Sequence, residues 1–158
     1  TIIRIGSAGT ISDKVDLRDI VLAMGTCTDS NYAMQYRLPG LYAPIADFGL
    51  LHTAYEQAGL YGIWTEVGNV VSTDVFYNDN TEYNKSWSKM NVLAVEMESA
   101  ALYMNAARLS KRALAMFTIS DNLLNGGSLS VKERQKGFDD MIKLSLETAV
   151  LSYVQGGK

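Results

Sequence analysis

The chain has 158 residues, of which 47% are hydrophobic and 20% are charged, and its formal net charge is −3. These values are typical of one globular domain with a sizeable core, and the acidic balance gives no basic footprint for nucleic acid. A single cysteine, Cys27, and a single histidine, His52, exclude an internal disulfide and leave no plausible metal site. We therefore expect a reducing, cytoplasmic setting, with no metal and no membrane partner.

The chain opens with a β-branched run, Ile2 to Ile5, which predicts a strand. The residues after it, read G-S-A-G, predict a turn in which successive backbone N–H groups between Gly6 and Gly9 can face an anion. Arg4 adds a permanent cation to this otherwise apolar strand. Because Gly-x-x-Gly turns are common, an ordinary turn with Arg4 in a surface ion pair is the alternative.

The middle of the chain predicts further strands and two helices. Residues 25–44 hold both prolines and many turn-forming residues, which predicts a long excursion that is functional or contacts a partner subunit. Helical spacing over 45–58 predicts a helix that ends at Gly59, and a shorter helix is expected over 82–90. The strand-like sequence 61–71 leads towards a pair of aromatic residues, which are either core or a flat face for a planar ligand.

The stretch 92–101, read V-L-A-V-E-M-E-S-A-A, organises the prediction. Its apolar start is typical of a buried parallel strand, and Glu96, Met97 and Glu98 follow directly. Two carboxylates beside a methionine are not expected to pack in a core, because burying either one unpaired is costly. They form either a solvated turn or part of a ligand pocket at the end of the sheet. Small residues and methionines as far as residue 107 predict a helix packed on the sheet.

The last third of the chain predicts a central strand and a helix. The longest apolar run lies within 112–119 and is expected to break at 120–122, read S-D-N. Residues 130–133, read S-V-K-E, form a capping box that predicts the start of the last helix, before a glycine tail at 156–157. Arg134 lies in the first turn of this helix, where a cation opposes the helix dipole, and this placement suggests a separate role.

Polar groups therefore follow three predicted strands: the glycines with Arg4, the carboxylates Glu96 and Glu98, and then Asp121. Because the ends of parallel strands lie at one edge of a sheet, we expect these groups to share one crevice. A cation with backbone N–H groups suits a phosphate, carboxylates suit sugar hydroxyls, and the aspartate suits a heterocycle.

Five motifs stand in the order of a known family: R-I-G-S-A-G at 4–9, S-T-D-V-F-Y at 72–77, V-E-M-E-S-A at 95–100, S-D-N at 120–122 and E-R-Q at 133–135. Over essentially its whole length the chain resembles the bacterial-type, hexameric purine nucleoside phosphorylases of the nucleoside phosphorylase superfamily. The resemblance implies an α/β fold whose mixed, largely parallel twisted sheet is partly closed into a barrel with flanking helices. It also implies reversible phosphorolysis of purine nucleosides in purine salvage, with phosphate as co-substrate, no cofactor, and a homohexamer built as a trimer of dimers.

The same resemblance implies roles for the matching residues. Phosphate would be bound by Arg4, Gly6, Ser7 and Gly9, and the ribose by Met97 and Glu98. The purine would be bound by Phe76, Val95, Glu96 and Ser120. Asp121 would be the general acid that protonates N7 of the leaving base, assisted by Arg134. Phosphate on one side and a proton donor on the other would offset the charges that develop as the glycosidic bond breaks.

Residues 1–158 are expected to form a single α/β domain that is the C-terminal two-thirds of a longer phosphorylase, because a native domain rarely starts inside a buried strand. Without the family's N-terminal third, little or no catalysis is expected. Asn122 stands where many relatives have histidine, and the loop 123–129 is unlike theirs. The alternatives are a nucleosidase acting on methylthioadenosine or adenosylhomocysteine, against which the cationic Arg4 argues, and a non-catalytic nucleoside-binding module.

Overall fold

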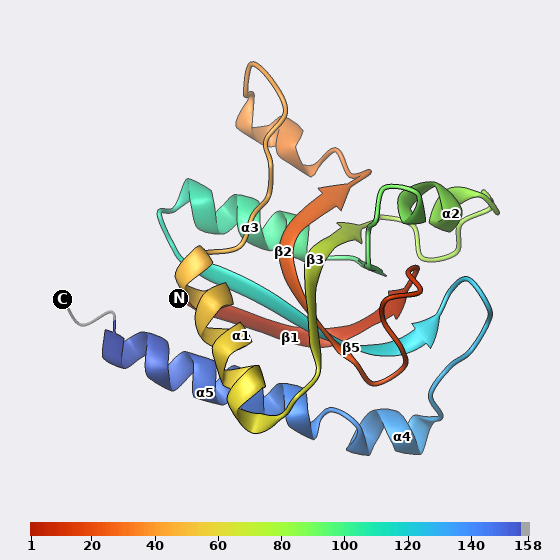
Figure 1. Cartoon of the computed structure of the whole chain (residues 1–158). Helices are drawn as coiled ribbons and strands as arrows, with labels where there is room; N and C mark the ends of the chain where they lie inside the picture. Colours follow the sequence, from red (N-terminus) through yellow and green to blue (C-terminus); the bar gives the residue numbers. More distant parts are fainter. Residues whose placement is uncertain (156–158) are drawn as a thin grey trace.

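The computed structural model describes residues 1–155 and contains a closed five-stranded barrel with helices around it (Figure 1). The strands are β1 (Ile2–Thr10), β2 (Ile20–Thr28), β3 (Thr65–Ser72), β4 (Ala94–Glu96) and β5 (Ala113–Asn122). Their order around the barrel is β1-β4-β3-β2-β5, and β5 pairs back with β1. The glycine tail expected at 156–157 lies outside the described residues.

The sheet is mixed. β1 and β5 are parallel, as are β2 with β3 and β3 with β4, whereas β1 with β4 and β2 with β5 are antiparallel. The expected mixed, largely parallel sheet with flanking helices is therefore confirmed, and the barrel is closed rather than only partly closed.

The helices cover the outside of the barrel. They are α1 (Phe48–Tyr61), α2 (Tyr83–Ser88), α3 (Ser99–Arg108), α4 (Val131–Lys136) and α5 (Asp139–Gln155), with a short 3-10 helix over Tyr32–Tyr36. α1 starts after Asp47, whose Oδ1 accepts from the N–H of Leu50 at 2.9 Å, and ends at Gly62 with a φ of 65°. The predicted end at Gly59 is wrong, because the left-handed residue that stops the helix is Gly62.

β5 is apolar on both faces over 113–117, because both of its faces are covered. In β5, Leu114 and Met116 pack on one side in a cluster with residues of α1 and α5. Phe117 and Ile119 belong to a second cluster, which includes Tyr103 of α3. Successive residues of β5 thus pack alternately into the two clusters. Because both faces of the strand are buried, β5 requires a continuous apolar run, and it contains the longest one in the chain.

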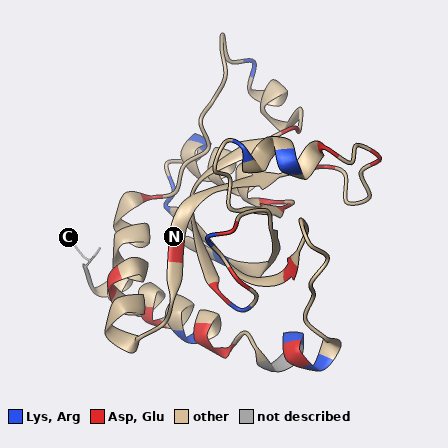
Figure 2. Cartoon of the chain, turned by 45° about the vertical axis from the view of Figure 1, so that its right-hand side comes forward, with Lys and Arg blue, Asp and Glu red and all other residues tan. Residues whose placement is uncertain are grey.

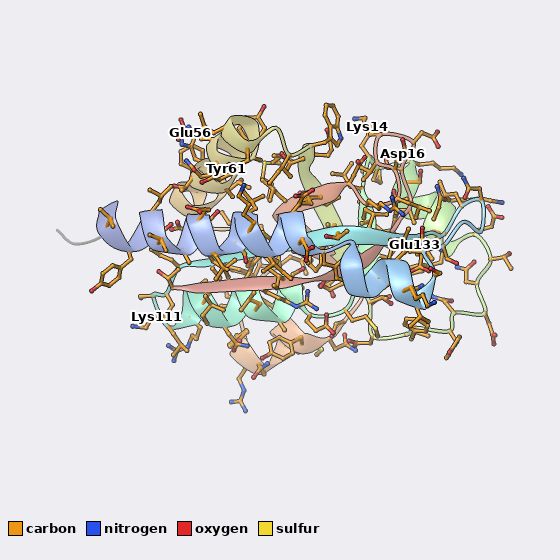
Figure 3. The ribbon with its side chains drawn as sticks, turned by 90° about the horizontal axis from the view of Figure 1, so that it is seen from below. Lys14, Asp16, Glu56, Tyr61, Lys111 and Glu133 are labelled. Atoms are coloured by element: carbon orange, nitrogen blue, oxygen red, sulfur yellow. The ribbon has the colours of Figure 1, made fainter. Side chains whose placement is uncertain are left out.

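α1 and α5 lie side by side (Figure 1, Figure 3). Figure 3 labels Tyr61 at the end of α1, and the Lys143 ammonium of α5 lies 3.8 Å from the centroid of its ring. Burial of part of Tyr61 raises the pKa of its phenol. A cation over an aromatic face is attracted to the ring, so this pair contributes to the contact between α1 and α5.

Residues 6–9 do not form the predicted turn. β1 continues through them to Thr10, in parallel register with β5, with Gly6 opposite Phe117 and Ser7 opposite Thr118. The break predicted at 120–122 is also wrong, because these residues remain in β5, where Asp121 and Asn122 pair with Gly9 and Thr10 at the end of β1. Each segment supplies the hydrogen-bonding partner that keeps the other extended, and this partner is invisible to local sequence patterns.

The expected last helix is two helices. The capping box is confirmed, since the N–H of Glu133 donates to Ser130 Oγ and the N–H of Ser130 donates to a Glu133 carboxylate oxygen, but it starts the short α4. α4 ends at Gly137, whose N–H donates to the Glu133 carbonyl at 2.7 Å. A Cβ at Gly137 would lie 2.7 Å from that same oxygen, so this close approach requires glycine.

The predicted excursion projects from the barrel as an arm between β2 and α1 (Figure 1). Its 3-10 helix is tied to α3 through Asn105, which accepts from the Tyr36 hydroxyl at 2.8 Å and donates to the Tyr32 hydroxyl at 2.7 Å. Leu41 at its outer part is fully exposed. Its role as a partner contact stays a prediction.

Acidic and basic residues are interspersed over the helices and loops (Figure 2). Within residues 1–155 no helix combines the length and the apolar character that crossing a membrane would require. The same residues contain no group of three or more His, Cys, Asp or Glu side chains arranged to hold a metal ion.

Candidate functional site

A cavity of about 600 Å³ opens where β1, β4 and β5 meet. It is lined by Arg4, Gly6, Ser7, Ala8, Gly9, Phe76, Val95, Glu96, Met97, Glu98, Ser120, Asp121, Leu123 and Arg134. Every residue that the sequence predicted for the site is in this set, and the sequence analysis missed only Ala8 and Leu123 as lining residues. The predicted convergence of the three segments in one crevice is confirmed.

The three segments meet in a different way from the one predicted. β4 runs antiparallel to β1, with Val95 opposite Gly9, so the residues that follow β4 turn back beside the middle of β1. On the other side, Ala8 pairs with Ile119 but Gly9 pairs with Asp121, which leaves Ser120 as an extra residue in β5. Such a bulge redirects side chains near the end of a strand, and here it lies at the wall of the cavity.

Arg4 lies along β1 and not out in solvent. Its guanidinium carbon is 5.0 Å from the centroid of the Phe117 ring, within the range of a cation–π contact. A Cβ on Gly6 would lie 2.9 Å from Arg4 Nη1, so glycine at this position leaves the room that the guanidinium occupies. Gly6 therefore serves the close approach of a side chain and not a turn.

Arg4 and Glu98 form an ion pair across the cavity, in which Nη2 of Arg4 donates to Oε2 of Glu98. The side chain of Glu98 is 59% exposed, whereas that of Arg4 is 25% exposed. Nη1 of Arg4 is buried and has no hydrogen-bond partner among the described residues. Buried donors are normally paired, so an unpaired guanidinium N–H in a cavity is a donor available to an anionic ligand.

Glu96 is buried, which the sequence analysis did not expect of either carboxylate. Only 5% of its surface is exposed, and its oxygens accept from the hydroxyls of Ser72 and Ser99 and from the backbone N–H groups of Glu98 and Ser99. The argument that these carboxylates do not pack in a core is therefore wrong for Glu96, because four donor groups replace water around it.

Asp121 is held from two sides at the end of β5. Nη2 of Arg134 donates to Oδ1 at 2.7 Å, and the hydroxyl of Ser120 donates to Oδ2 at 2.6 Å. Nε of Arg134 also donates to the Leu129 carbonyl at 3.1 Å, which fixes the direction of its side chain. The separate role suggested for this arginine by its place in the first turn of α4 is thus an ion pair with Asp121.

α4, which carries Arg134, is anchored by its own cap and by a second arginine. Nη2 of Arg18 donates to Oε1 of Glu133 at 2.6 Å, and Figure 3 labels Glu133 on α4. Hydrogen bonds from Ser130, followed by the Arg18 guanidinium, hold the pKa of Glu133 below its usual value. The position of Arg134 therefore depends on a carboxylate that is charged at neutral pH.

The rim of the cavity is apolar. Phe76 is 74% exposed and meets Tyr77 edge to face, with 4.9 Å between the ring centroids. Met97, which also lines the cavity, is 37% exposed. A broad exposed ring and a thioether at the mouth of a polar cavity offer surfaces for a planar, partly apolar ligand.

Leu123 covers Gly9. A Cβ on Gly9 would lie 2.7 Å from Cγ of Leu123, and the Leu123 N–H extends the ladder by donating to the Thr10 carbonyl at 2.9 Å. Asn122 is not among the residues that line the cavity, and its amide oxygen accepts from the N–H groups of Leu124 and Asn125 in the following turn. The sequence signal that could have identified Leu123 was its position as the apolar residue directly after the S-D-N motif at 120–122.

A sequence model of the phosphorylase superfamily matches residues 1–154 of the chain. Among curated relatives, the "purine nucleoside phosphorylase DeoD-type" of Geobacillus sp. (strain WCH70) is 45% identical over 150 residues, which cover 95% of this chain and 63% of that protein. The protein of the same name from Limosilactobacillus reuteri (strain DSM 20016) is 47% identical over 151 residues, which cover 95% of this chain and 64% of the relative. The chain thus spans about 63% of the length of such a relative.

Proposed function

The chain belongs to the phosphorylase superfamily, and we propose that its cavity binds a purine nucleoside together with inorganic phosphate for reversible phosphorolysis of the glycosidic bond. The products would be the free purine and a pentose 1-phosphate. The names of the similar relatives support this choice within the superfamily.

The observation that carries the proposal is that Arg4, Glu98 and Asp121, from three segments far apart in the sequence, line one cavity. A cation, an exposed carboxylate and a second carboxylate with its own arginine are what a phosphate, a sugar and a leaving purine need. No single motif supplies all three groups.

In this proposal the phosphate lies against Arg4, Gly6, Ser7 and Gly9. The buried Nη1 of Arg4 has a free N–H to donate, and Nη2 becomes available when the ion pair with Glu98 opens. A guanidinium can hold two phosphate oxygens at once, which a lysine ammonium does not do with the same geometry.

The sugar lies between Met97 and Glu98, and the carboxylate of Glu98 accepts from its hydroxyls. The exposure of this carboxylate permits the exchange of an arginine partner for a ligand partner. The same anion favours the positive charge that develops on the pentose as the bond to the base lengthens.

The purine lies against Phe76, Val95, Glu96 and Ser120, with N7 towards Asp121. A phosphate oxygen attacks C1′ of the pentose as the bond to the purine breaks, and Asp121, protonated when the nucleoside binds, gives its proton to N7 of the leaving base. Arg134 stays beside Asp121 to stabilise the carboxylate that forms, and the proton lost by the attacking phosphate restores the acid. No cofactor takes part.

We further propose a cytoplasmic homo-oligomer, arranged as a trimer of dimers, and assign residues 1–158 to one α/β domain of the phosphorylase.

The test is ligand binding followed by base release. Calorimetric titration of the 158-residue chain with inosine, phosphate and uridine is the first readout, because similar relatives are longer than this chain. Inosine and phosphate are expected to bind together, and uridine is not. Base release from inosine or adenosine is then measured by chromatography with and without phosphate. Little release is expected from this chain, and any release is expected to require phosphate.

Two outcomes would overturn this assignment. If the base is released equally well without phosphate, the reaction is hydrolysis and the chain is a nucleosidase. If neither inosine nor phosphate binds, the cavity has another ligand. Binding of both without any release of base would support the non-catalytic nucleoside-binding alternative for this chain.

A further inference from the structure

The start of α3 is capped in an unusual way. Glu98 occupies the N-cap position, where a side chain normally accepts from a backbone N–H of the first turn, but its carboxylate makes no such bond. Instead, the hydroxyl of Ser72 on β3 accepts from the N–H of Ala100 at 2.9 Å. Glu96 accepts from the N–H of Ser99 at 3.0 Å and from the N–H of Glu98 at 2.9 Å.

Two residues from neighbouring strands therefore perform the capping that Glu98 would otherwise perform. The Glu98 side chain is therefore not needed to cap α3, and its carboxylate forms the ion pair with Arg4 in the cavity. A Glu98 that capped its own helix would turn its oxygens towards α3 and away from the cavity.

The carboxylate of Glu96 has little capacity left for a ligand. A carboxylate offers about four lone-pair sites, and here four donor groups already point at it: two hydroxyls and two backbone N–H groups. The hydroxyl of Ser99 donates to Oε1 at 2.6 Å and also lies 3.1 Å from the Thr26 hydroxyl, so the network continues into β2. A ligand donor could bind Glu96 only by displacing one of these groups.

We propose that Glu96 is a positioning residue for Glu98 and not a ligand of the purine through its carboxylate. With Ser72, Glu96 caps α3 in place of Glu98 and so presents the Glu98 carboxylate to the hydroxyls of the sugar. This inference rests on the proposed function for the identity of the sugar, but the hydrogen bonds that it invokes exist without any ligand.

The test compares Glu96→Gln, Glu98→Gln, the double variant and Ser72→Ala in the full chain. Glu66→Gln on β3 is the matched control, because Glu66 lies outside this network and outside the cavity. For each variant the dissociation constants of inosine, hypoxanthine and phosphate are measured by calorimetry. Hydrogen exchange of the amides of residues 98–100 is followed without ligand.

Glu96→Gln keeps the shape of the side chain but presents an NH₂ to one of the four donors. Inosine affinity is expected to fall about tenfold, the effect of losing one well-placed hydrogen-bonding group, with hypoxanthine and phosphate affinities within about twofold of wild type. The double variant is expected to be no weaker for inosine than Glu98→Gln alone, because both substitutions remove the same interaction. Glu66→Gln is expected to change none of these constants.

An equal loss of hypoxanthine affinity would identify Glu96 as a purine ligand and overturn the proposal. Additive losses in the double variant would also overturn it. A parallel loss of all three affinities together with the melting temperature would show a merely structural residue.

If wild type does not bind inosine, the proposed function fails, and amide exchange decides this inference separately. Faster exchange at Glu98 and Ser99 in Glu96→Gln supports it, and unchanged exchange overturns it. Ser72→Ala, which removes only one hydroxyl, provides the same test at Ala100 if Glu96→Gln does not fold.

Discussion

Arg134 on α4 and Asp121 at the end of β5 form an ion pair with 2.7 Å between Nη2 and Oδ1. The pair joins the six-residue helix α4 to β5 and lies at the wall of the cavity. Both side chains are partly exposed, 42% and 31%, so the pair contributes little to stability, about 0–1 kcal/mol. The main effect of the ion pair is therefore expected on the chemistry of Asp121 and not on the stability of the fold.

Asp121→Asn is expected to lower whatever turnover of adenosine the wild-type chain shows by about 10²–10⁴-fold, since an amide cannot serve as the general acid. Nucleoside affinity is expected to stay nearly unchanged, because the substitution keeps the size and most hydrogen bonds of the side chain. Turnover in phosphate buffer and the dissociation constant are measured on the same preparation. Asp139→Asn, at the start of α5, is the control, and unchanged turnover in Asp121→Asn would remove Asp121 from its role.

Arg4→Met is expected to weaken phosphate binding by at least about tenfold, because it removes the guanidinium with its free N–H while keeping an apolar stem beside Phe117. Arg4→Lys is expected to restore only part of the affinity, since an ammonium lacks the fork geometry. Calorimetry with inorganic phosphate measures both. Arg112→Met is the matched control, because Arg112 also forms a partly exposed ion pair, with Asp47, and neither residue lines the cavity. Wild-type affinity in Arg4→Met would contradict the assignment.

Gly6→Ala is expected to displace the Arg4 side chain, because the new Cβ would lie 2.9 Å from Nη1. Since Nη1 is the far end of a flexible side chain, the fold should survive while phosphate affinity falls.

Gly59→Ala is expected to have the opposite effects to Gly6→Ala. Gly59 lies inside α1 with open space around it, so alanine there is expected to raise stability by about 0.5–1 kcal/mol. Urea unfolding and phosphate titration of both variants separate the two effects, and equal phosphate affinities would contradict the first.

The capping box predicts a pH dependence. The pKa of Glu133 is lower in the folded protein than its ordinary value of 4.5, chiefly through hydrogen bonds from Ser130. Because the pKa of Glu133 is lower in the folded than in the unfolded protein, its ionised carboxylate stabilises the fold at pH values above the unfolded pKa. This contribution to the free energy of unfolding is lost as the pH falls through the folded pKa. The urea midpoint of wild type is therefore expected to fall more steeply below about pH 4.5 than that of Glu133→Gln. Parallel pH profiles would show that Glu133 does not contribute.

Local patterns in the sequence predicted the features whose causes are local. The capping box at 130–133 was correct because its two hydrogen bonds join residues three positions apart. The strand over 113–119 was correct because burial on both faces demands a continuous apolar run. The site residues were identified by motifs, and the resemblance to a family assigned their roles before their geometry was known.

Other features depend on partners that are distant in the sequence. The residues of 6–9 can form a turn or a strand, and pairing with β5 decides for the strand. Whether Glu96 is solvated or buried depends on Ser72, which reaches it from a different strand. The sequence by itself determined which chemical groups this protein possesses and which segments are apolar enough to form the barrel. Only the tertiary structure decided that Glu96 is buried while Glu98 faces the cavity, because hydrogen-bond donors from other elements, and not the residue type, determine what each carboxylate binds.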